Sequence, residues 1–333
     1  VNRRPNQADI AARLGVSVST VSRALANEVG ISETVRRDVQ KVARSLGYRS
    51  KHVSPATADR RAVALLPLGS ATSGMSNFYF GIIEGMKAAA EAEGLALELR
   101  LVNETQVTLE LVERLLAQAE ATGVLLAGID AWDGLISWCA ERAVSAVLVN
   151  GVDPLMRINS VAPANFHGAF LATQRLIEAG HRRILHYTHP YRPTILQRRR
   201  GFEAAIAATP GAEGIIVGSN EQTVAQLFES IVSDRYGVTA LFNWNDMAAV
   251  EMLEGAHGDG RSLPPRFSII GFDDLPVAAM TNPRLSTMRV DREGIGRGAV
   301  RLLLAQMDGE TAVQQLEIGV TPVEGQTVFQ ITP

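Results

Sequence analysis

A short amphipathic segment near the start of the chain carries side chains suited to nucleic-acid contact. If residues 18–25 form a helix, Val18, Ser19, Ser22 and Arg23 point away from its apolar face. Guanidinium, hydroxyl and small apolar groups are the groups that pair with base edges and thymine methyl groups in the major groove of DNA. We therefore predict a DNA-reading helix close to the N-terminal end of the chain.

A preceding helix is expected to position this segment. Residues 8–14 place Ile10, Ala11 and Leu14 on one face, and Gly15 supplies a turn residue without Cβ strain. Two short helices joined by such a turn form a helix-turn-helix.

A third helix is predicted to close a miniature core with the first two. Ser17 is the expected N-cap of the second helix, and Ser32 is the expected N-cap of a third helix that runs to Gly47. The apolar stripe expected for the third helix comprises Val35, Val39, Val42 and Leu46.

The charge distribution supports a nucleic-acid partner for this part of the chain. Residues 1–61 hold 12 Lys and Arg against 5 Asp and Glu, a charge of +7, so the remainder carries −10 of the total of −3. A basic head collects phosphates while an acidic body is repelled by them. The alternative is that these arginines only solvate helix faces, and their coincidence with the two-helix pattern argues against it.

Length and cysteine content limit the class of protein. A chain of 333 residues is too long for one ordinary core, and no apolar run is long enough to cross a bilayer. The single cysteine, Cys139, excludes an internal disulfide. With no secretion signal recognisable, we expect a cytoplasmic protein without a membrane partner.

After a polar linker at 50–61, strands and helices alternate regularly. The predicted strands are 62–68, 95–101, 123–129, 145–150, 184–188, 214–218, 238–243 and 267–272. The predicted helices lie near 78–93, 105–120, 131–142, 166–180, 194–208, 221–235 and 246–255. Continuous apolar strands between helices predict two doubly wound parallel sheets, with a ligand cleft beyond the carboxyl ends of the strands.

Several segments carry recognisable motifs in order along the chain. They are DIAARLGVSVSTVSRAL (9–25), ISETVRRDVQKVARSLGYR (31–49), IEAGHRRI (177–184), QRRRGFEAAI (197–206), NDMAAV (245–250) and IIGFDDLPVAAMTNPRLSTMRVD (269–291). Together these segments resemble the lactose/galactose repressor (LacI/GalR) family over nearly the whole chain.

The resemblance implies an α/β protein with an N-terminal helix-turn-helix head of three helices. A two-lobed, doubly wound effector domain of the type I periplasmic-binding-protein fold would follow it. The implied parts are a head (1–49), a hinge or linker (50–61) and an effector and dimerisation domain (62–333). One lobe of this domain would comprise about 62–161 and 290–320, and the other about 162–289 and 321–333. The chain would cross between the lobes near 161–163, 283–290 and 319–323.

The function that the resemblance implies is transcriptional regulation, with repression favoured. The protein would bind near-palindromic double-stranded operator DNA as a homodimer, with a higher oligomer left open, and a small-molecule effector in the interlobe cleft would control it. For base reading the resemblance indicates Val18, Ser19 and Arg23, whereas Thr20 and Ser22 are expected to contact phosphates or to cap helices.

The resemblance also indicates the effector site. Arg198 matches an arginine that family members aim at ligand oxygens, and an exposed helix charge is the alternative for it. Asp273, at the end of a strand, is a candidate acceptor for sugar hydroxyls, while Asp274 is the expected N-cap of the next helix. The remaining candidates are the polar residues Asn150 and Asn245, of which Asn245 could be only a cap, and the aromatic residues Phe78, Tyr79 and Trp244, for which core packing is the alternative.

The sequence departs from the family pattern at the hinge. Tyr48 is followed by Arg49 and Ser50, and Thr57 stands where family members have a leucine that wedges into the minor groove. A helix could still begin at Pro55, but a threonine offers little apolar wedge for bending DNA. Ala164 is a further departure, because many relatives have an aspartate there.

Catalysis and metal binding find little support. His181, His186 and His189 lie close in sequence but straddle a helix end and a strand, and GIGRG at 294–298 falls inside a predicted helix. We expect no enzyme activity, no cofactor and no metal.

Two functions from different classes remain. The favoured one is an effector-controlled DNA-binding regulator, and its rival is a solute-binding or sugar-handling protein with an incidental helical N-terminal domain. A sugar or sugar acid is the favoured effector, with a purine or amino-acid-like ligand left open. The sequence does not distinguish induction from corepression.

Overall fold

The computed structural model describes residues 6–25, 31–45, 60–69, 76–103, 106–258 and 263–331. The chain divides into two compact units, Val1–Arg60 and Arg61–Pro333. The hinge features expected at Tyr48, Pro55 and Thr57 lie outside the described residues.

The first unit contains three helices within its described residues. They are α1 (Gln7–Leu14), α2 (Val18–Leu25) and α3 (Glu33–Ser45). Asn6 and Asp9 form a capping box at the start of α1, and Gly15 ends this helix in the left-handed conformation with φ 64°. The expected cap of α2 is confirmed, because the Ser17 hydroxyl accepts the amide of Thr20 at 3.0 Å.

A small apolar core joins these three helices. Ile10, Val21 and Val39 are fully buried, one from each helix, and Val35 and Val42 are partly buried against them. The last residue of the expected α3 stripe, Leu46, lies outside the described residues. Packing of an amphipathic face is what stabilises helices as short as α1 and α2.

The second unit contains two parallel sheets. The larger has the order β11-β5-β4-β3-β1-β2 and the smaller the order β7-β6-β8-β9. Strands of the larger sheet are β1 (Arg61–Pro67), β2 (Ala96–Val102), β3 (Gly123–Ala127), β4 (Ser145–Val149), β5 (Asn159–Pro163) and β11 (Gln315–Ile318). Strands of the smaller sheet are β6 (Arg183–Thr188), β7 (Glu213–Gly218), β8 (Ala240–Asn243) and β9 (Ser268–Ile270).

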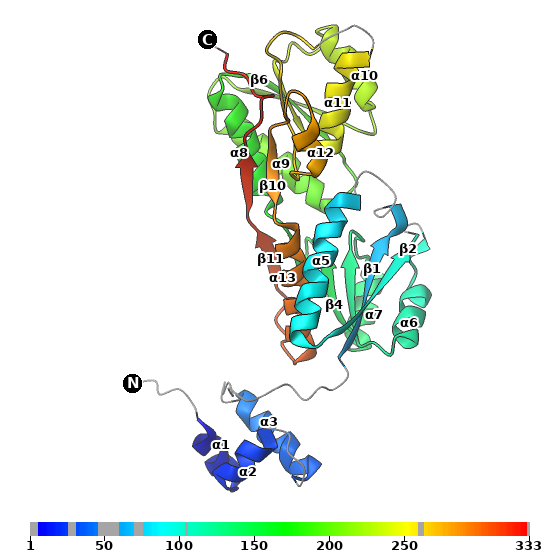
Figure 1. Ribbon diagram of the computed structural model, residues 1–333, viewed down its shortest axis with the longest axis vertical. Helices are drawn as coiled ribbons and strands as arrows, with labels where there is room; N and C mark the ends of the chain where they lie inside the picture. Colours follow the sequence, from blue (N-terminus) through cyan, green and yellow to red (C-terminus); the bar gives the residue numbers. More distant parts are fainter. Residues whose placement is uncertain are drawn as a thin grey trace. The chain divides into compact units, whose positions relative to one another are not determined.

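Helices cover both faces of each sheet (Figure 1). In the first lobe, which is built on the larger sheet, α5 (Ser76–Glu93) and α13 (Arg292–Met307) cover one face, and α6 (Leu109–Gln118) and α7 (Asp133–Glu141) cover the other. In the second lobe, α8 (Asn165–Glu178) and α9 (Pro193–Ala207) lie opposite α10 (Val224–Val232) and α11 (Asp246–Gly258).

Alternation along the strands assigns each side chain to one of these layers. On β1, Ala64 and Leu66 contact the α5 and α13 layer, whereas Val63 and Leu65 contact the α6 and α7 layer. Because both faces are covered, the strands are apolar throughout, which is the pattern that predicted them.

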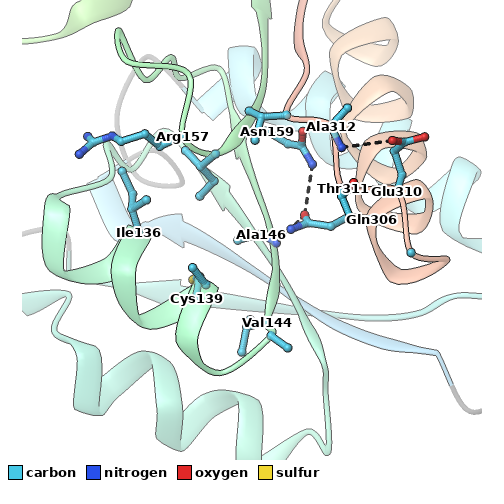
Figure 2. Close-up of a pocket in the computed structure, with 15 residues that line it drawn as sticks. Ile136, Cys139, Val144, Ala146, Arg157, Asn159, Gln306, Glu310, Thr311 and Ala312 are labelled. Carbon is cyan, nitrogen blue, oxygen red and sulfur yellow. Dashed lines mark hydrogen bonds between the residues drawn. The ribbon is translucent and has the colours of Figure 1, made fainter.

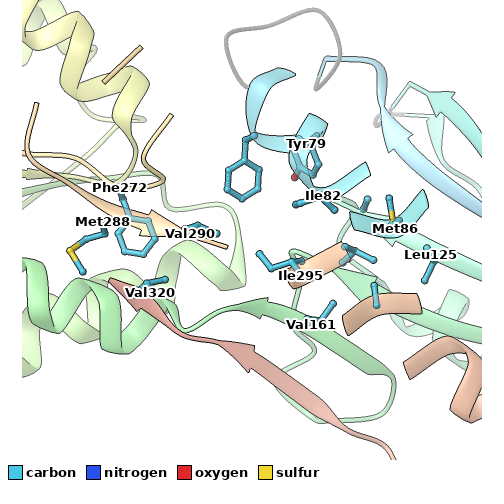
Figure 3. Close-up of a cluster of buried hydrophobic side chains, with 14 of the residues drawn as sticks. Tyr79, Ile82, Met86, Leu125, Val161, Phe272, Met288, Val290, Ile295 and Val320 are labelled. Carbon is cyan, nitrogen blue, oxygen red and sulfur yellow. The ribbon is translucent and has the colours of Figure 1, made fainter. Parts of the chain in front are cut away.

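The chain passes between the lobes at three places. It leaves β5 for α8, returns along β10 (Thr287–Val290) into α13, and leaves β11 for β12 (Val320–Val323). β10 and β12 pair with each other in an antiparallel ladder. Figure 3 shows buried side chains of both lobes and of these crossing strands in one apolar cluster, with Tyr79 and Ile295 on one side and Phe272 and Met288 on the other.

The apolar runs predict eight of these strands, and they do not predict β5, β10, β11 and β12. β11 lies at the edge of its sheet and is only partly buried, so its sequence contains no continuous apolar run. In the part of the chain that the structure describes, no helix is long and apolar enough to span a membrane.

The helices α5 and α13 approach each other at glycines. A Cβ atom on Gly85 would overlap the carbonyl oxygen of Glu293, and one on Gly296 would overlap that of Ile82. This contact brings the helix backbones together and leaves no room for side chains.

We expect Gly85→Ala to lower the free energy of unfolding by about 1–3 kcal/mol, because the new methyl group overpacks the helix contact. Urea unfolding of the full chain measures this. Gly255→Ala on α11 is the matched control, since its Cβ would stand 3.5 Å from the nearest atom, and it should be neutral or stabilising. Equal midpoints for the two variants would contradict the role given to Gly85.

Candidate functional site

The exposed face of α2 carries the side chains expected to read DNA. Val18, Ser19, Ser22 and Arg23 are exposed, whereas Val21 and Leu25 are buried against the other helices. Val18 is 46% exposed, so it does not pack beside Leu25 in the small core.

A cluster of hydroxyl groups lies at the start of α2. The Ser17 hydroxyl lies 3.0 Å from that of Ser19 and 2.8 Å from that of Thr20. Thr20 is partly buried, and its hydroxyl and amide both contact the cap residue. Thr20 therefore takes part in the N-terminal cap of α2, while Ser19 and Arg23 lie on the exposed face of this helix.

The polar residues expected in the effector site lie at the carboxyl edges of the two sheets. Asn150 follows β4 of the first lobe, Asn245 follows β8 of the second, and Asp273 follows β9. All three are buried, as is Arg198 on α9. Buried polar side chains at such an edge are typical of ligand sites in α/β folds.

Arg198 is the most heavily bonded of these residues. Its guanidinium donates to Asn165 Oδ1 at 2.8 Å, to the carbonyl oxygen of Trp244 and to Asp273 Oδ1 at 3.4 Å. It also lies 3.7 Å from the centroid of the Phe272 ring. The alternative of a solvated helix charge is therefore wrong for this residue.

Burial and charge oppose each other at this cluster. Burial lowers the pKa of Arg198, and the Asp273 carboxylate counters this. Burial raises the pKa of Asp273 to about 6, against the effect of Arg198 and Arg292. Burial likewise raises the pKa of Asp246, although the Thr287 hydroxyl and the Leu275 amide donate to its carboxylate.

The residues beside Asp273 and Trp244 have capping and pairing roles. Asn245 Oδ1 accepts the amide of Ala248 at 2.9 Å, which caps α11. The prediction for Asp274 is wrong, because Leu275 is the N-cap of α12 (Pro276–Met280). A proline at the first helical position places the cap one residue later, and Asp274 instead accepts Arg289 Nε at 2.6 Å.

The aromatic candidates are packed in the described structure. Phe78 and Tyr79 are buried with their rings edge to face at 5.3 Å, and half-buried Trp244 stacks on His189 at 5.1 Å. Of the three, Tyr79 reaches the polar edge, because its hydroxyl accepts Asn150 Nδ2 at 3.2 Å.

Arg192 and Asp130 were not among the residues expected from the sequence. Arg192 Nε and Nη2 donate to the two carboxylate oxygens of Asp130 at 3.2 and 3.1 Å, and Nη2 also donates to the Asn150 carbonyl at 2.9 Å. Burial disfavours the charge on Arg192, but Tyr79 and Asp130 raise its pKa overall. The position of Asp130 directly after a predicted strand, like that of Asn150, was the signal that could have found it.

The three neighbouring histidines have separate partners. His181 lies between the Thr239 and Ser268 hydroxyls at 2.8 and 2.7 Å, and His186 bonds to a backbone carbonyl inside the second lobe. His189 contacts the Ser219 hydroxyl at 2.9 Å. Among the described residues, no group of three or more His, Cys, Asp or Glu side chains is placed to hold a metal ion.

A pocket of about 460 Å³ lies at the opposite, amino-terminal end of the larger sheet (Figure 2). Ile136, Cys139 and Asn159 line it, with Gln306 near the end of α13, and none of the predicted effector residues does. Burial raises the pKa of the Cys139 thiol to about 11, so this thiol stays protonated at neutral pH.

Comparison with known proteins identifies the family. Residues 8–51 match the family model "Bacterial regulatory proteins, lacI family", and residues 173–328 match "Periplasmic binding protein-like domain". The HTH-type transcriptional regulator CelR of Thermobifida fusca is 30% identical over 321 residues, which cover 93% of this chain and 94% of that protein. The chain belongs to the lacI family of bacterial regulatory proteins.

Other relatives agree with this assignment. The HTH-type transcriptional regulator reg1 of Streptomyces lividans is 30% identical, with 92% of this chain and 91% of that protein covered. This lacI-family chain is thus a DNA-binding transcriptional regulator and not an enzyme, and the rival reading as a solute-binding or sugar-handling protein is not supported.

Solved structures share the fold of this regulator. The transcriptional regulator CelR–cellobiose complex is 25% identical and superposes with a TM-score of 0.69, over 97% of this chain and 100% of that one. The lac repressor dimer bound to operator and the anti-inducer ONPF is 21% identical, with a TM-score of 0.68 over 98% and 100% of the two chains, which shows likeness of fold. The predicted α/β architecture with an N-terminal helix-turn-helix is confirmed.

A buried histidine near Arg198, His186, makes the stability of the protein depend on pH. His186 stacks on Phe242 at 4.6 Å, and burial lowers its pKa to about 3, below the value of about 6.5 in an unfolded chain. The unfolded state therefore takes up a proton first as the pH falls. The stability contributed by neutral, buried His186 is complete above about pH 6.5 and is lost as the pH falls toward 3. Over this range the free energy of unfolding changes by up to about 1.4 kcal/mol per pH unit.

We expect His186→Phe to flatten the dependence of unfolding free energy on pH between 6.5 and 4, as measured by urea unfolding at a series of pH values. His167→Gln, at an exposed position on α8, should leave the slope unchanged. An unaltered slope in His186→Phe would remove this histidine as a source of acid sensitivity.

Proposed function

We propose that this regulator is a cytoplasmic repressor that binds near-palindromic operator DNA as a homodimer and is controlled by a small, uncharged, hydroxyl-rich effector of the sugar class. The observation that carries the effector assignment is the convergence of buried polar side chains from both lobes. Asn150 and Tyr79 come from the first lobe, and Arg198 and Asp273 come from the second.

The pairing of charges favours a neutral effector over an acidic one. Arg198 is bonded to Asp273 and Arg192 to Asp130, so these two guanidinium groups already face carboxylates. An anionic ligand at Arg198 would have to displace the Asp273 carboxylate and leave it without its partner, which is costly because both side chains are buried. The hydroxyl groups of a neutral ligand can instead form hydrogen bonds with the carboxylate lone pairs and the guanidinium N–H groups that these ion pairs do not use. The CelR–cellobiose complex supports a sugar in the same fold.

For operator recognition we assign base reading to Val18, Ser19 and Arg23, and phosphate contact or capping to Thr20 and Ser22. Their exposure on one face of α2 supports this assignment, together with the capping contacts of Thr20. The same proposal includes a linker at 50–61, the lobe boundaries given above and the pairing of two heads on adjacent half-sites. For the effector site we assign Phe78, Tyr79, Asn150, Arg198, Trp244, Asn245 and Asp273.

We expect Arg23→Ala to weaken binding to a specific duplex by about 1–3 kcal/mol and to relax preference at one base pair per half-site. Fluorescence anisotropy measures this with a duplex selected from a random library by the unmodified protein, at fixed salt. The control is Arg13→Ala, which removes an exposed arginine at the end of α1. Equal loss on the selected and on random duplexes would assign Arg23 to phosphates.

A thermal-shift screen tests the effector class. Neutral monosaccharides and disaccharides, including cellobiose, are compared with the corresponding sugar acids, and we expect stabilisation by a neutral member. A ligand at 100 times its Kd adds about 2.7 kcal/mol. Asp273→Asn should abolish the shift, whereas Asp274→Asn, which alters the neighbouring surface ion pair with Arg289, should retain it. A shift with acids alone would overturn the proposed class.

A further inference from the structure

One ion pair connects the lobes directly across the effector edge. Arg192 belongs to the second lobe, where it precedes α9, and Asp130 follows β3 in the first lobe. The two N–H···O contacts of 3.2 and 3.1 Å engage both carboxylate oxygens, which is the bidentate geometry that fixes an arginine and a carboxylate in relative position.

Further contacts hold the same guanidinium on the first lobe. Arg192 Nη2 donates to the Asn150 carbonyl oxygen at 2.9 Å, and Nη1 lies 3.5 Å from the Tyr79 hydroxyl. The hydroxyl of Tyr79 packs on Gly128, where a side chain would overlap it. Three segments of the first lobe therefore converge on one side chain of the second.

The backbone fixes the Arg192 end of the pair. Arg192 occupies the N-cap position of α9 without a capping bond from its own side chain, and Pro193 begins the helix. The side chain is thus directed outward from a rigid helix start, free of a local capping role.

The ion pair acts at a distance from the places where the chain crosses between lobes. β3, which precedes Asp130, is two strands from β5, whose end is a crossing, so Asp130 lies about 10 Å from that crossing. Arg292 also joins the lobes, through the Asp273 carbonyl oxygen at 2.7 Å, but it lies two residues after the crossing strand β10. When the lobes separate about these crossings, a contact far from the crossings lengthens more than a contact beside them.

We propose that Arg192 and Asp130 form an interlobe latch that holds the two lobes closed without any small molecule. The pair supplies part of the free energy of closure from the chain itself, so an effector that binds between the lobes shifts an equilibrium already biased toward the closed form. Arg192 is in this sense a positioning residue for the effector edge.

Partial exposure makes this latch reversible. The side chains of Arg192 and Asp130 are 22% and 33% exposed, so water and salt reach the pair when the lobes separate. Exposed ion pairs contribute up to about 1 kcal/mol, which corresponds to an approximately fivefold change in the ratio of closed to open forms.

The test measures the distance between lobes in the full chain. Nitroxide labels at Gln118→Cys on α6 and Ala225→Cys on α10, both exposed positions, report it by pulsed electron resonance in a Cys139→Ser background. The labelled chain is diluted with unlabelled chain so that only distances within one chain are recorded.

We expect one narrow distance distribution in the parent. Arg192→Asp and Asp130→Arg should each add a second population, with the closed fraction reduced roughly fivefold relative to the open one. The double variant restores an ion pair of reversed polarity and should recover the parent distribution. The control, Arg199→Ala, breaks an ion pair with Glu203 within α9 and should leave the distribution unchanged.

Two results would overturn the latch. One is an unchanged distribution in both single variants, with circular dichroism confirming that they are folded. The other is a double variant no closer to the parent than the single variants, which would mean that Arg192 acts through contacts other than Asp130. Because neither DNA nor effector is present, failure here leaves the proposed function untouched, and failure of the effector screen leaves the latch untouched.

Discussion

The burial of one guanidinium organises the polar carboxyl edge of the second lobe's sheet. Arg198 can remain charged inside the protein only because acceptors from three different segments surround it: Asn165 at the start of α8, the Trp244 carbonyl after β8 and Asp273 after β9. Each acceptor is fixed by the end of a helix or strand. The ends of these elements are consequently held together by a requirement for charge compensation that apolar packing alone does not impose.

The same requirement shapes the backbone around it. Asp273 has φ 116°, a conformation that side-chain-bearing residues rarely adopt, and its neighbour Asp274 also has a positive φ. Their carbonyl oxygens accept N–H groups of Arg292 from the first lobe. Strained residues that persist at a polar edge are typical of ligand sites, since the surrounding bonds offset the cost of the strain.

The sequence predicted most of the layered fold and part of the site, for a physical reason. Strands covered on both faces, such as β3 and β4, need apolar side chains at every position, and this pattern is visible in the sequence. The edge strand β11 buries little, so it has no such pattern. The contact of Arg192 with Asp130 joins residues 62 positions apart, and no local spacing encodes it. Asp273 was a candidate because it directly follows a predicted apolar strand, and the structure places it, buried, beside Arg198.

The glycine contact between α5 and α13 has a mechanical consequence. Where side chains separate two helices, rotamer changes can absorb a displacement, but backbones that touch at Gly85 and Gly296 have no such compliance. The two helices must then shift as one stiff body. We therefore expect Tyr79, near the start of α5, and Arg292, at the start of α13, to move together when either of them is displaced.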